Sequence, residues 1–373
     1  MLLRWRRTLC WLGFLLTMAG ASYSPSLGLA PRRSWCGIYP TVVTPWRCDG
    51  TVDEDALRRQ IEFQLCGGVH GILVLGTLGE GDYATLQERA AVIRTAVATV
   101  RQRVPVVVGV HTSDYQLART MARQAQQLGA DAILVKYVGD PCADPERVYQ
   151  FYKNLSQERI LPMFYYHFPG QTGLYLPPQD LARILLLPGI VGIKTSTLDL
   201  AETRTLIYLT RGHGKVFLSG TALNLTQYLD AGGHGAMCPE AVLLPDLTVA
   251  TYHAYLQGAT VQARTWQRQL FIVAPLLRDR PTPVFLARHI TMFTQDRDIS
   301  IPVRSDTGQA RLKATLNALG ICMNATVKCP LPQLDCQDAI KVHLAASRIK
   351  RLCKHSECVL EAEPEKQRTF FAD

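Results

Sequence analysis

The sequence predicts a (β/α)8 barrel with additional C-terminal helices. Short apolar runs alternate with helical patterns, the runs are apolar throughout, and eight of them fall within about 200 residues. Near-continuous apolar strands separated by helices are typical of a parallel sheet that is buried on both faces. A doubly wound sheet is the alternative, but no Gly-x-Gly-x-x-Gly motif opens a helix after the first run.

The elements follow one another in a regular order. The runs predicted as strands are 38–43, 71–75, 104–110, 132–135, 161–166, 190–193, 216–218 and 235–237. The helical patterns between them are 53–66, 85–100, 114–128, 145–157, 177–187, 198–209 and 221–230. Residue types that favour helix ends support these boundaries: Thr51 and Asp53 precede the first helix, and Gly67, Gly129 and Gly232 follow helix ends. The barrel is therefore expected at 36–242, with a helical extension at 243–321.

The N-terminal residues 1–35 are expected to form a targeting leader. They contain five arginines and no acid, an apolar run at 9–16 and small residues at 19–21. That run is too short to span a membrane and is typical of a signal peptide. Arg6 and Arg7 would also fit a twin-arginine export signal. The acid-free segment that follows would fit a two-part leader for an organelle. We expect an exported or organellar protein, with no stable membrane span once the leader is removed and its compartment undefined.

Residues 322–373 are set apart as a cysteine-rich tail of unknown structure. Five of the chain's 11 cysteines lie there, at 322, 329, 336, 353 and 358. They could form disulfides in an oxidising compartment, but their odd number leaves the pairing open. The chain has no paired Cys-x-x-Cys motifs of the kind that hold zinc, and no metal is predicted.

The net charge of +9 does not indicate a nucleic-acid-binding protein. The leader contributes +5 and the tail +1, so the barrel and its extension carry only +3. No basic stripe interleaved with aromatic residues is present, and we expect no nucleic-acid partner.

Lys194 is the residue with the clearest chemical implication. It ends the apolar, glycine-containing run 189–193 and thus the sixth predicted strand. A buried ammonium is either matched by a carboxylate or kept neutral, and a neutral amine in a dry pocket is a nucleophile toward carbonyls. The alternative is a lysine whose chain reaches from the strand end into water.

Other candidate residues also lie at strand ends, where barrel active sites form. The turn 76–79 could bind a small carboxylate through successive N–H groups and the Thr77 hydroxyl, or be an ordinary glycine turn. Tyr166 could move a proton in a dry site, or be a core tyrosine with a satisfied hydroxyl. We do not assign a catalytic role to His167, and we expect Glu80 to pair or cap locally.

Together these residues resemble the dihydrodipicolinate synthase/N-acetylneuraminate lyase family of pyruvate-dependent class I aldolases. The resemblance covers about three quarters of the chain, from 37 to 320. The motifs that carry it are Tyr39-Pro40-Thr41-Val42-Val43-Thr44-Pro45, Gly76-Thr77-Leu78-Gly79-Glu80, Tyr166 with Pro169 and Thr172-Gly173, Gly192-Ile193-Lys194, Leu218-Ser219-Gly220 and Gly232-Gly233-His234-Gly235.

The resemblance implies a Schiff-base mechanism without a metal or organic cofactor. Lys194 would form a covalent imine with pyruvate or a related 2-oxo acid, which then reacts with an aldehyde, or the reverse. Tyr166 would be the general acid/base, and Thr77 would relay a proton. The resemblance also implies substrate-binding roles and, by analogy, a homo-oligomer, a dimer or tetramer. The substrate-binding residues would be Gly76, Leu78, Gln171, Gly220 and Tyr137.

The chain departs from the two best-known members of the family. Leu78 replaces a hydroxyl residue, Gln171 stands where the synthases have an arginine, and Ala222 and Leu223 stand where the sialic-acid lyases have an acidic pair. Tyr137 is the residue nearest to a tyrosine that the synthases contribute from a neighbouring subunit. Losing the arginine removes bidentate binding of a second carboxylate. We therefore expect an aldehyde substrate that is less charged than either known one.

Two other functions stay open at this stage. One is a 4-hydroxy-tetrahydrodipicolinate synthase of lysine biosynthesis, in which Gln171 anchors the second substrate more weakly. The other is a barrel that binds a 2-oxo acid without turning it over. A metal-dependent barrel enzyme is disfavoured, because no His, Asp and Glu residues group at the strand ends.

Overall fold

The described residues form a parallel eight-stranded barrel, as the sequence predicts. The structure is a computed structural model and describes residues 34–140, 143–277 and 308–352. The leader predicted for 1–35 thus lies almost wholly outside the described residues. The strands are β1 Gly37–Pro40, β2 Ile72–Val74, β3 Val106–His111, β4 Ala132–Lys136, β5 Met163–His167, β6 Ile190–Thr195, β7 Val216–Ser219 and β8 Gly235–Cys238.

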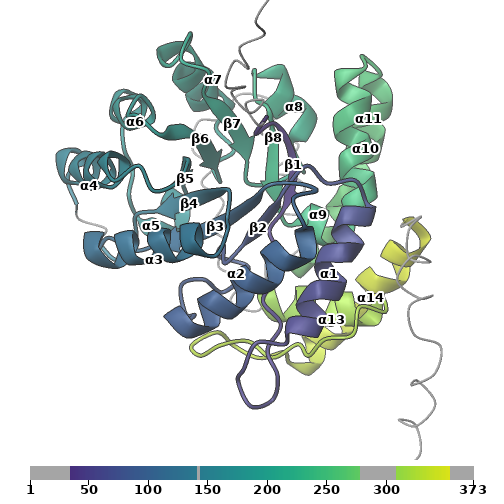
Figure 1. Cartoon of the computed structure of the whole chain (residues 1–373). Coiled ribbons are helices and arrows are strands. Elements are labelled where there is room, and N and C mark those ends of the chain that lie inside the picture. The colour runs from purple at the N-terminus through teal and green to yellow at the C-terminus, as the bar shows by residue number, and fades with distance from the viewer. Residues whose placement is uncertain (1–33, 141–142, 278–307, 353–373) are drawn as a thin grey trace, which may run out of the picture. The chain divides into compact units, whose positions relative to one another are not determined.

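Neighbouring strands pair in parallel in the order β1-β8-β7-β6-β5-β4-β3-β2. An isolated parallel bridge between Thr41 and Leu73 joins the two ends of this sheet and closes the barrel. Helices surround the strands (Figure 1). They are α1 Glu54–Cys66, α2 Leu86–Val100, α3 Tyr115–Gln127, α4 Pro145–Gln157, α5 Pro169–Thr172, α6 Pro178–Leu185, α7 Leu200–Leu209, α8 Leu225–Asp230, α9 Glu240–Leu243, α10 Pro245–Leu256, α11 Thr260–Leu270, α13 Gly308–Ala318 and α14 Cys336–Leu352, with a 3-10 helix η1 at Phe271–Leu276.

Side-chain caps explain where several helices begin. Asp53 accepts a hydrogen bond from the N–H of Ala56 and starts α1, as the sequence predicts. Thr85 and Glu88 form a reciprocal capping box at the start of α2. The helix predicted at 221–230 begins only at Leu225, because the Thr221 hydroxyl donates to Glu240 and accepts from the N–H of Leu223. That turn is part of the candidate site described below.

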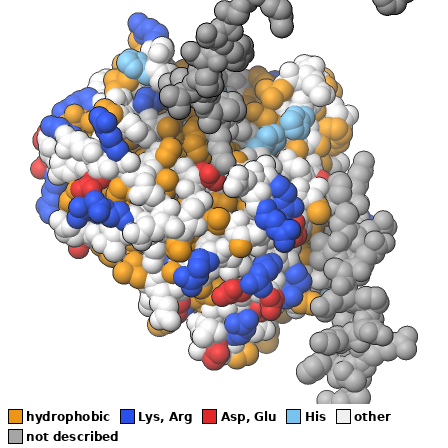
Figure 2. Space-filling model, viewed as in Figure 1, with side chains coloured by type: hydrophobic (Ala, Val, Ile, Leu, Met, Phe, Trp, Pro, Cys, Tyr) orange, Lys and Arg blue, Asp and Glu red, His pale blue; other side chains and the backbone are white. Residues whose placement is uncertain are grey.

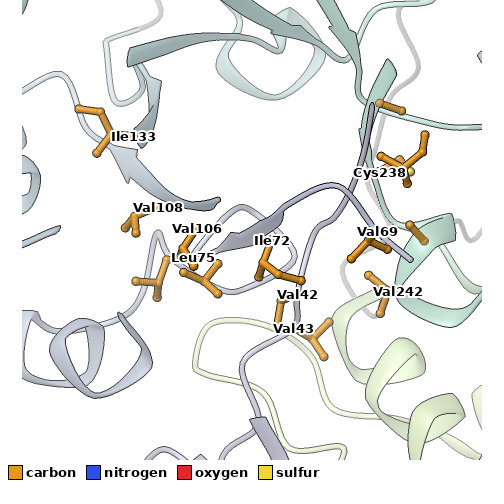
Figure 3. Close-up of a cluster of buried hydrophobic side chains, with 14 of the residues drawn as sticks. Val42, Val43, Val69, Ile72, Leu75, Val106, Val108, Ile133, Cys238 and Val242 are labelled. Carbon is orange, nitrogen blue, oxygen red and sulfur yellow. The ribbon is translucent and has the colours of Figure 1, made fainter. Parts of the chain in front are cut away.

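The core lies between the strands and the helices that cover them. Figure 3 shows aliphatic side chains from the strands, such as Ile72, Val106 and Val108, together with Val42 from the segment after β1 and Val242 from α9. All five are at most 2% exposed. Burying each of them stabilises the fold by about 1.5–3 kcal/mol. The strands are therefore held rigidly, which fixes the side chains at their carboxyl ends.

Part of the segment set apart as a tail is integral to this fold. Up to Leu352 it belongs to the same compact unit as the barrel. Its helix α14 packs against η1 and α13, and a buried ion pair joins Arg311 of α13 to Asp338 of α14 at 2.6 Å. Sequence reasoning set it apart because mixed charges interrupt the apolar pattern. Among the tail's described residues, Cys322, Cys329 and Cys336 are free thiols, and residues 353–373 lie outside the described part.

The described surface carries no extended basic stripe on the face in view. Figure 2 shows Lys and Arg side chains scattered among acidic, hydrophobic and uncharged ones. Within residues 34–140, 143–277 and 308–352, no helix has the length and apolar character needed to cross a membrane.

Candidate functional site

A cavity of about 170 Å³ lies at the carboxyl ends of the barrel strands. Six of the residues predicted from the sequence line it: Thr77, Leu78, Tyr166, Gln171, Lys194 and Gly220. These residues come from four different strand ends, and only the closed barrel brings them together. Gly76 and Tyr137 are not among the lining residues.

Lys194 is the next-to-last residue of β6 and is 4% exposed. Its Nζ lies 4.4 Å from the centroid of the Tyr166 ring, which comes from the paired position on β5. Among the described residues, no carboxylate lies within ion-pair distance of Nζ. Burial lowers its pKa to about 7, against the smaller opposing effects of Cys238 and Glu240. The amine is therefore buried, is neutral in about half of the molecules at pH 7, and does not reach into water.

Tyr166 is buried beside Lys194 and connects it to polar neighbours. Burial raises the pKa of its phenol, while Lys136 and hydrogen bonds with Ser196 and Thr77 oppose the rise. The hydroxyl thus remains protonated at neutral pH, with the hydroxyls of Ser196 and Thr77 in contact. Such a chain of hydroxyls can move a proton between the cavity and the amine.

The turn after β2 has the form of an anion-binding nest. Gly81 N–H donates to the Gly76 carbonyl at 3.1 Å, and the Thr44 hydroxyl donates to the Gly79 carbonyl at 2.6 Å, so the turn is fixed from both sides. Within the described residues, the backbone N–H groups of Thr77 and Leu78 make no hydrogen bond. Two unpaired donors at a cavity wall are suited to a small carboxylate. Gly76 contributes only its carbonyl to this turn. It therefore lies behind the residues that line the cavity.

Two further residues considered in the sequence analysis, Glu80 and His167, have structural partners. Glu80 is fully buried, forms an ion pair with Lys313 and accepts from the Trp46 indole at 2.9 Å. His167 Nε2 lies 3.3 Å from Glu202. Neither Glu80 nor His167 lines the cavity.

Tyr137 points away from the cavity and into the core. Its ring packs edge-to-face on Phe151 at 5.1 Å, and its hydroxyl donates to Asp140 at 3.2 Å. The preceding residue, Lys136, is the last residue of β4 and takes the position near the site.

Sequence reasoning missed three charged residues. The side chain of Lys136 is buried and forms an ion pair with Asp82, a cavity-lining residue, at 3.0 Å. Glu240 also lines the cavity; it accepts from the Thr221 hydroxyl at 2.7 Å and from the Ala222 N–H at 2.8 Å. The signal for Lys136 was available, because it ends the fourth apolar run just as Lys194 ends the sixth.

These residues correct one step of the sequence argument. The changes at Gln171, Ala222 and Leu223 predict a pocket that has lost polar groups for binding the aldehyde. Asp82 and Glu240 nevertheless add carboxylates to the cavity wall, from positions that the family motifs do not cover. No group of three or more His, Cys, Asp or Glu residues in the described part of the chain is arranged to hold a metal ion.

Comparison with known proteins identifies the family. Residues 34–318 match the Dihydrodipicolinate synthetase family. The chain belongs to this family. It is 33% identical over 290 residues to the 4-hydroxy-tetrahydrodipicolinate synthase of Phenylobacterium zucineum, covering 76% of this chain and 97% of that protein. The corresponding enzyme of Maridesulfovibrio salexigens is 32% identical over 294 residues, covering 76% of this chain and 98% of the relative.

Solved structures of the family share the fold. The crystal structure of dihydrodipicolinate synthase from Thermotoga maritima superposes with a TM-score of 0.73 at 25% identity, covering 84% of this chain and 98% of that chain. The chain is thus an enzyme of the family, a (β/α)8-barrel aldolase/lyase, and the matched segment includes every predicted site residue.

Proposed function

We propose that this enzyme forms a Schiff base between Lys194 and pyruvate or a related 2-oxo acid, and that the enamine derived from it adds to an aldehyde, or the reverse. The main support for this proposal is the burial and the lowered pKa of the Lys194 amine. Its amine is buried in the cavity wall, has no carboxylate partner within the described residues, and has a pKa of about 7. Such an amine is available as a nucleophile at neutral pH.

The reaction can be followed through the residues of the cavity. The neutral Nζ attacks the keto carbon of the 2-oxo acid, and loss of water gives a protonated imine. Loss of a proton from the adjacent carbon then gives an enamine, whose electron pair forms the new bond to the aldehyde carbon. Water releases the product and the free amine. The proposed chemistry uses the covalent imine alone and requires neither a metal nor an organic cofactor.

The surrounding groups are assigned roles that fit their positions. The N–H groups of Thr77 and Leu78 would hold the carboxylate of the 2-oxo acid. Tyr166, whose hydroxyl stays protonated, would supply and recover the proton at the substrate oxygen, with Thr77 as its relay. Gly220 leaves room at the end of β7, where a Cβ would lie 2.2 Å from the Ser196 hydroxyl.

The curated relatives favour a second candidate, 4-hydroxy-tetrahydrodipicolinate synthase. That activity needs an aldehyde that carries a carboxylate of its own, and this chain offers Gln171 rather than an arginine to bind it. A non-catalytic 2-oxo-acid-binding barrel is the third candidate. It predicts a cavity that binds pyruvate without turnover.

A turnover assay separates these candidates. The purified enzyme is incubated with pyruvate and a panel of aldehydes, and carbon–carbon bond formation is followed by mass spectrometry. We expect turnover with at least one aldehyde and loss of turnover in Lys194→Arg, which keeps the charge but cannot form the imine. Full turnover in Lys194→Arg would contradict the mechanism. Aspartate semialdehyde as the best aldehyde, together with complementation of a lysine-requiring strain, would establish the synthase instead.

Two properties of the whole protein are proposed from the sequence and the family. Residues 1–35 would direct the enzyme out of the cytosol or into an organelle. The enzyme would act as a homo-oligomer, a dimer or tetramer, which light scattering of the mature protein would measure.

A further inference from the structure

The connection between α13 and α14 lies at the carboxyl end of the barrel and reaches the cavity. Residues 326–331 of this connection, here called the strap, run past α2 (Figure 1), where the Lys328 side chain forms an ion pair with Glu88. Leu331, at the end of the strap, lines the cavity. The strap lies beyond residue 318, where the match to the family ends, so the family motifs assign it no role.

Glu80 joins the strap to the turn after β2. Its side chain is fully buried, and its Oε2 accepts from the Lys328 N–H at 2.7 Å and from the Trp46 indole at 2.9 Å. Its Oε1 pairs with Lys313 of α13, whose ammonium also donates to the Thr326 carbonyl of the strap at 2.6 Å. A buried carboxylate is stable only when it is paired and hydrogen-bonded, so these contacts hold Glu80 and the strap together.

The backbone of Glu80 has a conformation that needs such anchors. Its φ is +56°, in the left-handed region that residues other than glycine rarely adopt. Leu75, at the other end of the turn, has a φ of +55°. Residues persist in this region where the surrounding contacts over-determine the backbone. For Glu80, those contacts come from Trp46, from α13 and from the strap.

The backbone of Glu80 also sets the direction of the two N–H groups that are proposed to bind the carboxylate. The N–H of Glu80 donates to the Thr77 carbonyl at 3.2 Å, and the next N–H, that of Gly81, donates to the Gly76 carbonyl at 3.1 Å. In a trans peptide, the carbonyl and the N–H that follows it point in opposite directions. Fixing the Gly76 carbonyl therefore directs the Thr77 N–H, and fixing the Thr77 carbonyl directs the Leu78 N–H.

Other contacts hold the same turn, so the strap is one of several supports. The Gln309 amide of α13 donates to the Thr77 carbonyl at 3.4 Å. From α2, the buried Arg89 donates to the Gly81 carbonyl at 3.4 Å. Loss of the strap contact should therefore weaken the turn without abolishing it.

We propose that the strap is a positioning element of the active site, which holds Glu80 and thereby orients the N–H groups of Thr77 and Leu78 that bind the carboxylate of the 2-oxo acid. Leu331 adds an apolar side chain to the cavity wall. The proposal rests on the Schiff-base function above and gives the segment after the family match a part in it. A loosened strap should weaken binding of the carboxylate and leave imine formation by Lys194 intact.

The test compares pyruvate with methyl pyruvate, which has the same keto group but no charged carboxylate. Each compound is titrated in the presence of borohydride, and the readout is the concentration that gives half of the maximal reduced adduct on Lys194. Lys328→Pro removes the N–H group that donates to Glu80, whereas Lys328→Ala removes the same side chain and keeps the N–H. We expect the half-saturating pyruvate concentration to be roughly tenfold higher in Lys328→Pro than in Lys328→Ala, the effect of one hydrogen bond to a charged group. The value for methyl pyruvate should differ much less between the two variants.

A merely structural role of the strap predicts a different result. A general distortion of the cavity would raise the half-saturating concentrations of both compounds together. An equal shift for pyruvate and methyl pyruvate, or no shift for either, would therefore overturn the proposal. Lys313→Met tests the same link from α13, because it removes the cation that binds both Glu80 and the Thr326 carbonyl. It should also raise the half-saturating concentration of pyruvate selectively, by roughly tenfold.

Hydrogen exchange of the wild type keeps the proposal testable if these variants fold poorly. Coupling between two sites is reciprocal, so an occupied carboxylate site should stabilise the strap. We expect peptides that contain residues 326–331 to exchange more slowly in the reduced pyruvyl adduct than in the free protein, and peptides from α11 to exchange equally in both. Unchanged exchange in the strap would contradict the proposal.

Failure of this proposal and failure of the Schiff-base function give different results. An adduct on Lys194 whose dependence on pyruvate is the same in Lys328→Pro and Lys328→Ala rejects only the role of the strap. The absence of an adduct in the wild type, with pyruvate and with other 2-oxo acids, rejects the Schiff-base function, and the role of the strap with it.

Discussion

The amine of Lys194 should lose its proton near neutral pH. Lowering the pH should therefore protonate the amine and stop it from acting as a nucleophile. With a pKa of about 7, about half of the molecules carry a neutral amine at pH 7 and about 1% at pH 5. A lysine with the ordinary pKa of 10.5 would be neutral in only about 0.03% of molecules at pH 7. Burial thus increases the nucleophilic fraction at pH 7 by roughly 10³-fold.

Competitive labelling measures this directly. The protein is treated briefly with acetic anhydride between pH 5 and 10, and acetylation of each lysine is read from peptide masses. Labelling of Lys194 should reach half of its plateau near pH 7. Lys153 and Lys341, which lie on outer helices and are partly exposed, serve as internal controls. Labelling of Lys194 that rises in parallel with these two lysines would refute the argument that burial keeps the amine neutral.

Three further predictions concern other parts of the chain. Tyr166→Phe should lower kcat by roughly 10²-fold, because a general acid/base is lost, while pyruvate trapping on Lys194 still goes to completion; an unchanged kcat in a steady-state assay would exclude the role. Asp338→Ala should lower the free energy of unfolding by about 3–5 kcal/mol in urea titrations, since it removes the carboxylate of the buried ion pair with Arg311; a loss under about 1 kcal/mol would show that α14 contributes little. Mass spectrometry of the protein from its native cells should find an N-terminus within or just after residues 1–35, and an intact Met1 would contradict the predicted leader.

The fold could be predicted almost completely from the sequence because its determinants are local. Each strand is a short apolar run, and several helices begin at a side-chain cap or are followed by a glycine, so periodicity and capping locate many of the elements. The helix at Leu225–Asp230 was predicted to begin too early, at 221, because a hydrogen bond from Thr221 to Glu240 of the next unit fixes that turn. Contacts between distant segments leave no periodic pattern in the sequence, so periodicity cannot predict them.

The candidate site was predicted in part, for the same reason. Lys194, Tyr166 and Thr77 are found because they end apolar runs and match a family motif. Lys136 and Asp82 belong to no motif. Their significance comes only from the closed barrel, which brings Lys136 Nζ at the end of β4 to 3.0 Å from Asp82 Oδ1 in the turn after β2. Tyr137 is predicted because it lies nearest to a tyrosine that the synthases contribute from a neighbouring subunit, and that role stays a prediction. Within its own chain, Tyr137 faces α4 and its neighbour Lys136 faces the site.

The measurement that tests the central claim most directly is the mass of the protein after incubation with pyruvate and sodium borohydride. We predict one reduced pyruvyl group per chain, located on the peptide that contains Lys194, and no adduct in Lys194→Arg. An unmodified protein, with pyruvate and with a panel of other 2-oxo acids, would contradict the Schiff-base mechanism. An adduct on any other lysine would contradict the assignment of Lys194.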